Sequence, residues 1–292
     1  MTTVDQRFLS VRDLLQDGRI CLDGPLISDA TKFAVECLNL PQSVDTICER
    51  AGITRDVYNH YADILNNLFK GFNTMFEIAD DFGAIIKTVD AACKKTLEFA
   101  AKAQSDFPSL FDLFRQLRDK PTPEVKEKLN KLTMELIVSA NTASRTSGSI
   151  SLAGVINAWN DNREYLRGMY ADLVKRMQDP SLQEILEKLL NIHGGIVGLD
   201  NLKKWIESLD EHTGKAVKDL EYFRGSWEAI DTDATTLQEF LYDPHSPKVE
   251  VFLRVELAHL LLGWKDVTDE INKLIEEHLQ SAVEAIDHAP HR

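Results

Sequence analysis

The sequence predicts an all-α protein, and three observations lead to this fold class. The composition is 43% hydrophobic and 27% charged over 292 residues, which is typical of a folded globular protein. Only 14 Gly and 9 Pro occur, so turn signals are few and the elements between them are long. Apolar residues recur in alternating steps of four and three, the spacing of one helix face. We expect an elongated antiparallel bundle of four to five long helices with heptad-patterned apolar stripes.

Pro and Gly divide the chain into an N-terminal part and four long pieces. Residues 1–53 are predicted to form short helices packed on a rod of long helices, which spans residues 54–287. The remaining residues, 288–292, are expected to be a flexible tail. The long helices of the rod are predicted at 54–119, 122–179, 201–242 and 248–287, with a tongue-like segment at 181–200.

The first two long helices begin at recognisable capping residues. Thr54 is an N-cap candidate for the first helix, whose apolar stripe continues from Val57 to Ala103. Thr122, followed by Pro123 at the first helical position, is an N-cap candidate for the second. The second helix contains a tract of small residues at 139–154. Such a tract either lets another helix approach closely or breaks the helix that contains it.

The last two long helices carry the same pattern. Asp200 is a candidate N-cap for the third, whose stripe runs from Leu202 to Leu241. Two Pro-bearing turns at 243–247 separate it from the fourth, whose stripe runs from Leu253 to Leu274. Helices of comparable length joined by short turns bury their stripes by packing antiparallel.

The tongue-like segment is the most unusual part of the sequence, because three glycines and several aliphatic residues follow one another within eight positions. Two interpretations remain open: the aliphatic residues form a hydrophobic cap on the end of the bundle, or they are exposed and enter lipid after a conformational change. Its apolar part, residues 192–199, is too short to cross a bilayer of about 30 Å as a helix. In the second interpretation the membrane-contacting residues are Ile192, Ile196, Val197 and Leu199, and the hinge residues are Gly194, Gly195 and Gly198.

Charge and cysteine usage exclude other classes of function. With 33 Lys and Arg against 47 Asp and Glu, the formal net charge is -14, which argues against binding to nucleic acid. Charged residues are spread over positions 1–20, so we expect a soluble cytosolic protein without a signal peptide. The cysteines lack metal-site spacing and are predicted to be free and buried: Cys21, Cys37, Cys48 and Cys93.

Two pairs of polar residues suggest catalytic chemistry, and neither is complete. Asp80 and Asp81 resemble the paired acids that hold magnesium in helical diphosphate-binding enzymes, but the companion motif is missing. Glu256 and His259 have the spacing of a di-iron ligand pair, which needs a second pair on another helix. We therefore expect no enzymatic activity and no cofactor. Stabilisation by magnesium would be needed to support the diphosphate-binding alternative.

Two stretches of the chain carry a resemblance to a known group of proteins. Residues 38–103 contain LNLPQSVDTICERAGITRDVYNHYADIL and, in the long helix that follows, FNTMFEIADDFGAIIKTVDAACKKTLEFAAK. Residues 223–274 contain FRGSWEAIDTDATTLQEFL and LLLGWKDVTDEINKL, each with a Trp followed by a short apolar ladder. These patterns resemble the α-helical pore-forming toxins of the cytolysin A, haemolysin BL and alpha-xenorhabdolysin type, in particular the first subunit of alpha-xenorhabdolysin.

The resemblance implies a function without chemistry. A soluble helical protein would hide its tongue, release it at a membrane and associate into an oligomer. Its partners would be the lipid membrane, a second toxin subunit or both, in a homo- or hetero-oligomer. It would then act on a target-cell membrane after release. The alternative is a non-enzymatic cytosolic scaffold or adaptor whose acidic helices bind other proteins.

Overall fold

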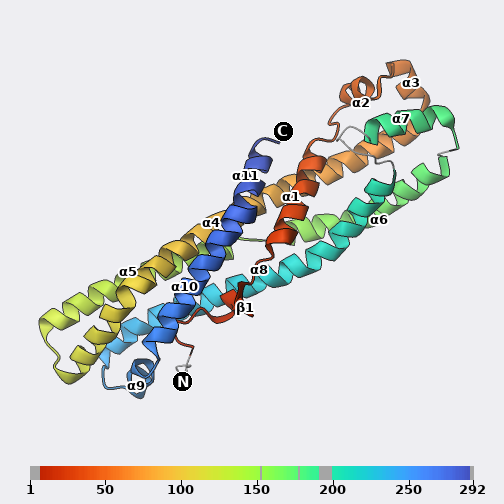
Figure 1. Cartoon of the computed structure of the whole chain (residues 1–292). Coiled ribbons are helices and arrows are strands. Elements are labelled where there is room, and N and C mark those ends of the chain that lie inside the picture. Colours follow the sequence, from red (N-terminus) through yellow and green to blue (C-terminus); the bar gives the residue numbers. More distant parts are fainter. Residues whose placement is uncertain (1–6, 152, 177, 191–198, 290–292) are drawn as a thin grey trace. The chain divides into compact units, whose positions relative to one another are not determined.

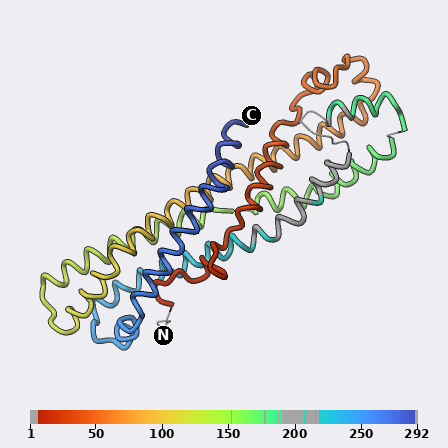
Figure 2. The backbone as a smooth tube through the Cα atoms, in the orientation of Figure 1, coloured from red at the N-terminus to blue at the C-terminus, as the bar shows by residue number. Residues whose placement is uncertain are grey.

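The computed structural model describes residues 7–151, 153–176, 178–190 and 199–289 (Figure 2). These residues are mostly helical, and the strands among them form a single two-residue pair. The all-α fold class is therefore confirmed.

The elements follow one another along the chain as labelled in Figure 1. The N-terminal part contains η1 (Arg12–Leu14), β1 (Leu15–Gln16), β2 (Arg19–Ile20), α1 (Gly24–Leu38), α2 (Val44–Ala51) and α3 (Arg55–His60). The middle contains α4 (Ala62–Asp119), α5 (Pro123–Gly148), α6 (Ala153–Arg176), α7 (Pro180–Leu190) and α8 (Leu199–Tyr242). The C-terminal part contains α9 (Pro247–Leu253), α10 (Leu257–Leu274), η2 (Ile275–Leu279) and α11 (Gln280–Asp287).

The chain divides into two compact units. Unit 1 consists of Met1–Gly24, Lys87–Ile150 and Val217–Gln280. Unit 2 consists of Pro25–Ile86, Ser151–Ala216 and Ser281–Arg292. The long helices α4 and α8 each contribute residues to both units.

Unit 1 is built around buried aromatic side chains from α4, α8 and α10. The ring of Phe99 lies 5.3 Å from that of Trp227 and 4.9 Å from that of Trp264, measured between centroids. All three side chains are fully buried. Thr96, one turn before Phe99 on α4, accepts a hydrogen bond of 3.1 Å from the Trp227 indole. The aromatic layer thus combines close ring packing with a specific polar contact between α4 and α8.

Unit 2 joins α4 and α6 through a close approach at a glycine. A Cβ atom at Gly71 of α4 would lie 2.5 Å from the sulfur of Met169 on α6. Leu68 and Phe72 beside this glycine, and Leu166 on α6, are completely buried. The absent side chain at position 71 therefore makes the room that Met169 fills.

The first two long helices differ from the expected 54–119 and 122–179 in where they are interrupted. A short α3 ends at His60, and α4 begins only at Ala62 and continues through Pro108. The helix expected over 122–179 is two helices, because α5 ends at Gly148 and α6 begins at Ala153. The tract of small residues contains this break, and three of its members on α5 are also buried: Ala140, Ala143 and Ser147.

Residues 7–22 belong to the part where short helices were predicted, but they form no α-helix. They form the single turn η1 and a hairpin in which Leu15 pairs with Ile20 and Gln16 with Arg19. Asp17 and Gly18 occupy the turn with φ angles of 52° and 77°. Positive φ at both central positions is what a two-residue hairpin loop of type I′ requires, and Asp-Gly is a favoured pair for it. This local turn chemistry outweighs helix formation there.

The last three helical elements, α10, η2 and α11, follow one another without a gap and contain an irregular turn. The buried residues of α10 follow steps of four and three, at Leu260, Trp264, Val267, Ile271 and Leu274. The next buried residue is Leu279, five positions on, and Ala282 and Ile286 follow. The five-residue step coincides with η2, which is a π-helical turn.

Candidate functional site

The structure describes the two ends of the predicted tongue-like segment. Ile192, Ile196 and Val197 lie outside the described residues, as do the predicted hinge glycines: Gly194, Gly195 and Gly198. Leu199 is the first residue of α8, so the helix begins before the expected cap at Asp200. The helix that leads into the segment from the N-terminal side is α7.

α7 is a short amphipathic helix with one apolar face. Its buried side chains are spaced by three, one and three residues, which places them on one side of the helix. They are Leu182, Ile185, Leu186 and Leu189, with exposed fractions of 1%, 5%, 1% and 2%. This face belongs to the helix that directly precedes the predicted apolar residues 192–199. The spacing was visible in the sequence, but the position of the covering helix was not.

The helix that packs against α7 is α2. Both ends of α2 are capped: Ser43 accepts a hydrogen bond from the backbone of Thr46, and Gly52 ends the helix in the left-handed conformation with φ of 62°. Its buried residues are Ile47 and Ala51, each with no exposed surface. A separately capped two-turn helix with buried apolar residues thus packs against α7.

A hydrogen bond joins two junctions between helices at the start of α7. Tyr61, between α3 and α4, donates its hydroxyl to Oδ2 of Asp179, between α6 and α7, at 3.1 Å. The other oxygen of Asp179 accepts from the backbone N–H groups of Ser181 at 2.9 Å and Leu182 at 3.3 Å. The backbone hydrogen bond from Leu182, followed by those from Tyr61 and Ser181, lowers the pKa of the Asp179 carboxyl. Asp179 therefore acts as the N-cap of α7 in its ionised form.

An open groove of about 480 Å³ lies between α4 and α6 in the same unit. Tyr165 crosses it and donates its hydroxyl to the carbonyl of Asn67 at 2.7 Å. The ammonium of Lys70 lies 4.7 Å from the centre of the Tyr165 ring, and Arg176 pairs with Asp63 at 2.7 Å. These contacts join α4 to α6 and bring together no nucleophile and general base.

The polar pairs considered for catalysis lie on the surface. Asp80 and Asp81 are exposed on α4. Glu256 and His259 pair with each other at 3.0 Å on one turn, with both side chains exposed. Within the described ranges, no three or more His, Cys, Asp and Glu side chains gather in a way that could hold a metal ion.

The four cysteines are free thiols. Three are buried as predicted, whereas Cys48 on α2 is half-buried. Burial, followed by the nearby charge of Asp219, raises the pKa of Cys21 to about 12. Burial likewise raises the pKa values of Cys37 and Cys93 well above the ordinary range. These three buried groups are protonated and unreactive at neutral pH.

None of the helices in the described part of the chain combines the length and the apolar character needed to span a bilayer. Comparison of the sequence with models of known protein families and with curated proteins gives no match.

Proposed function

We propose that the chain is a component of a pore-forming toxin. In this proposal a bundle of four to five long heptad-patterned helices converts from a soluble form into a membrane-bound oligomer. The observation that carries the proposal is the buried apolar face of α7, a helix that contacts α2 and precedes the glycine-rich segment 192–199. The resemblance of residues 38–103 and 223–274 to the α-helical toxins supports the same function.

The conversion requires α7 to separate from α2 and to place its apolar face against another apolar surface. Each fully buried aliphatic side chain contributes about 1.5–3 kcal/mol, so exposing the four buried residues of α7 to water would cost about 6–12 kcal/mol. In water this cost keeps α7 in place. A lipid surface, or a partner subunit that takes the same face, offsets it. Release also breaks the hydrogen bond between Tyr61 and Asp179.

The short segment defines the part that the chain plays. Residues 192–199 are too few to cross a bilayer, so we assign the chain to a binding or stabilising component that seats in one leaflet and leaves membrane crossing to a second subunit. Ile192, Ile196, Val197 and Leu199 are the proposed lipid contacts. The chain would be made as a soluble cytosolic protein and would act after release on the membrane of a target cell.

A cytosolic scaffold or adaptor is the second candidate, and the surplus of acidic residues favours it. A net charge of -14 supplies solubility and steers basic partners toward the helices. A scaffold needs no lipid contact, so membrane association separates the two candidates.

Flotation of the purified chain with phosphatidylcholine vesicles, followed by cross-linking of the floated fraction, tests the proposal. We expect the chain to float and to cross-link into species larger than a monomer. Replacing Ile196 and Val197 together with Asp should abolish flotation with little change in melting temperature. The matched control places Asp at Val138 and Val174, which are 61% and 45% exposed, and should float normally.

A wild-type chain that stays with the soluble fraction, with and without anionic lipid, would contradict self-sufficient membrane binding. Equal loss of flotation in both double variants would show that added charge, rather than the 196–197 contact, is responsible. A large loss of stability in the Ile196 and Val197 variant would identify these residues as core.

A further inference from the structure

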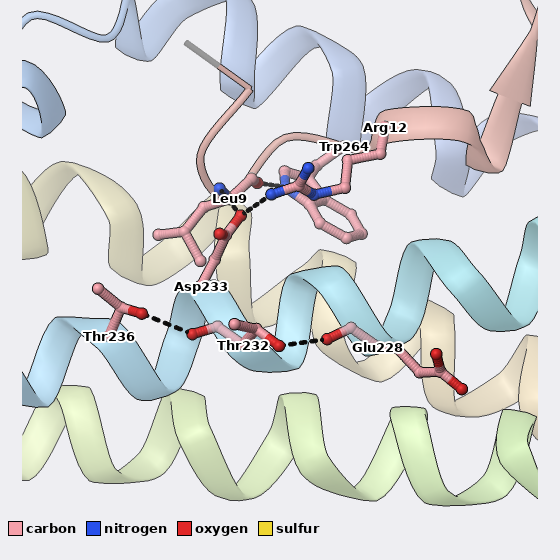
Figure 3. A network of polar contacts seen from close by, with 7 residues as sticks. All are labelled: Leu9, Arg12, Glu228, Thr232, Asp233, Thr236 and Trp264. Carbon is pink, nitrogen blue, oxygen red and sulfur yellow. Dashed lines mark hydrogen bonds and ion pairs between the residues drawn. The ribbon is translucent and has the colours of Figure 1, made fainter. Parts of the chain in front are cut away.

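The N-terminal strap, defined as residues 7–14, binds to unit 1 in the manner of a peptide ligand. It carries no α-helix and ends in the single turn η1, yet its apolar side chains are buried. Phe8, Leu9 and Leu14 are 2%, 1% and 0% exposed. Figure 3 shows this segment above α8, with α10 behind it.

An aromatic pocket receives the first anchor of the strap. The Phe8 ring stacks on Phe240 of α8 at 5.7 Å and meets the edge of Phe252 of α9 at 5.4 Å. Phe252 is itself packed against Phe111 and Phe114 of α4. Phe8 therefore completes an aromatic cluster to which three helices contribute.

Two side chains hold the backbone of Leu9, and we name them the Asp233–Trp264 clamp. The Leu9 N–H donates to Oδ2 of Asp233 on α8 at 2.8 Å, and the Leu9 carbonyl accepts from the Trp264 indole on α10 at 3.0 Å (Figure 3). Leu9 has a φ of 57°, a left-handed conformation that costs a non-glycine residue about 1–2 kcal/mol. The clamp holds the strap in a shape that an isolated segment does not favour.

Arg12 is the charged anchor of the strap. Its guanidinium contacts the same oxygen of Asp233 at 2.5 Å, and the two side chains are 14% and 13% exposed. Its φ is also positive, at 47°, and its buried Nε atom has no hydrogen-bond partner. Without Arg12, the largely buried Asp233 carboxylate would keep the hydrogen bond from the Leu9 N–H but lose its positive partner. The site therefore favours a basic residue at position 12.

The clamp and the aromatic pocket recognise an aromatic residue, a leucine backbone and an arginine in the order Phe-Leu-x-x-Arg. None of these contacts depends on the covalent connection between the strap and the rest of unit 1. The chain continues from Leu14 into β1, where Leu15 is extended and pairs with Ile20. The eight residues of the strap before this hairpin would span at most about 26–29 Å if they were fully extended.

We propose that the Asp233–Trp264 clamp also accepts residues 7–14 of a second copy, so that copies of the chain join by exchanging straps. Exchange of an identical element makes an interface from contacts that already exist, which makes it a low-cost route to a dimer. This proposal rests on the oligomer of the proposed function, because it supplies the contact between protomers.

Two variants with complementary defects test the exchange. Arg12→Glu places a second carboxylate beside Asp233. We expect the strap of this variant to detach by charge repulsion, while its clamp stays intact and unoccupied. Asp233→Ala keeps an intact strap and destroys the clamp. Each variant alone should be monomeric by analytical ultracentrifugation, and an equimolar mixture in lipid-free buffer should form a 1:1 dimer. The chain that carries both substitutions should fail to dimerise with itself.

A peptide assay keeps the test decisive if the mixture is difficult to fold. A fluorescent peptide of residues 6–16 should bind the Arg12→Glu chain at least about tenfold more tightly than the same peptide with Glu at position 12, since hydrogen bonds to charged groups contribute about 1.5–3 kcal/mol. It should not bind the Asp233→Ala chain. Circular dichroism of each variant establishes that it is folded.

A monomeric mixture of the two folded variants overturns the exchange, and so does equal binding of the two peptides to the Arg12→Glu chain. Both assays contain no lipid. A chain that fails to float while its variants dimerise would therefore refute membrane binding and leave the exchange supported.

Discussion

The hydrogen bond between Thr96 and Trp227 provides the sharpest test of the unit 1 core. Thr96 has no exposed surface, and its hydroxyl donates to the Ala92 carbonyl at 2.9 Å while accepting from the Trp227 indole at 3.1 Å. Replacing Thr96 with Val preserves the shape of the side chain and removes the acceptor. The buried Trp227 N–H is then left without this partner, at a cost of about 1–3 kcal/mol.

Urea unfolding followed by far-ultraviolet circular dichroism measures this cost. With a slope of about 3 kcal/mol per molar urea, the midpoint should fall by about 0.3–1 M. The control is the same substitution in a Trp227→Phe background, where no indole donor remains. There we expect Thr96→Val to change the free energy of unfolding by less than about 0.5 kcal/mol. Equal losses in both backgrounds would refute the assigned role of the hydrogen bond.

Three further predictions concern other parts of the chain. Gly168→Ala should raise the free energy of unfolding by about 0.5–1 kcal/mol, because the new Cβ in this helix would meet no atom within 4 Å. Gly24→Ala should lower it, because the new Cβ would clash with the His278 ring. A thiol reagent should label Cys48 in the native chain and the three buried cysteines only after unfolding. The folded-state pKa of Asp179 is lowered, so its ionised carboxyl stabilises α7 at pH values above 3.8, the ordinary pKa of the group. This contribution should disappear as the pH falls through the folded-state pKa, and hydrogen exchange in residues 180–190 should then become faster.

The sequence was sufficient to predict the all-α fold class, because in many stretches long-range packing agrees with the local pattern. Three residues of the predicted third stripe are completely buried in unit 1: Phe223, Trp227 and Ile230. Thr122 caps α5 as expected, with a hydrogen bond from the backbone of Val125. In such stretches propensity, capping and periodicity all favour the same structure.

The interruptions and the candidate site were less accessible to sequence reasoning. The break at Tyr61 falls inside an uninterrupted apolar pattern, and its partner Asp179 is 118 residues away. The strap was equally hidden, because Leu9 is held by Asp233 at a separation of 224 residues. Contacts of this kind depend on which helices become neighbours, and periodicity carries no information about that choice.

The π turn of residues 275–279 lets the C-terminal helix accommodate one extra residue. It absorbs one extra residue, so Leu279, Ala282 and Ile286 are buried although they are one position out of step with α10. Deleting one residue from this turn would return the spacing after Leu274 to four and would leave the downstream buried face unchanged. We therefore expect a chain that lacks one residue of this turn to keep the same core.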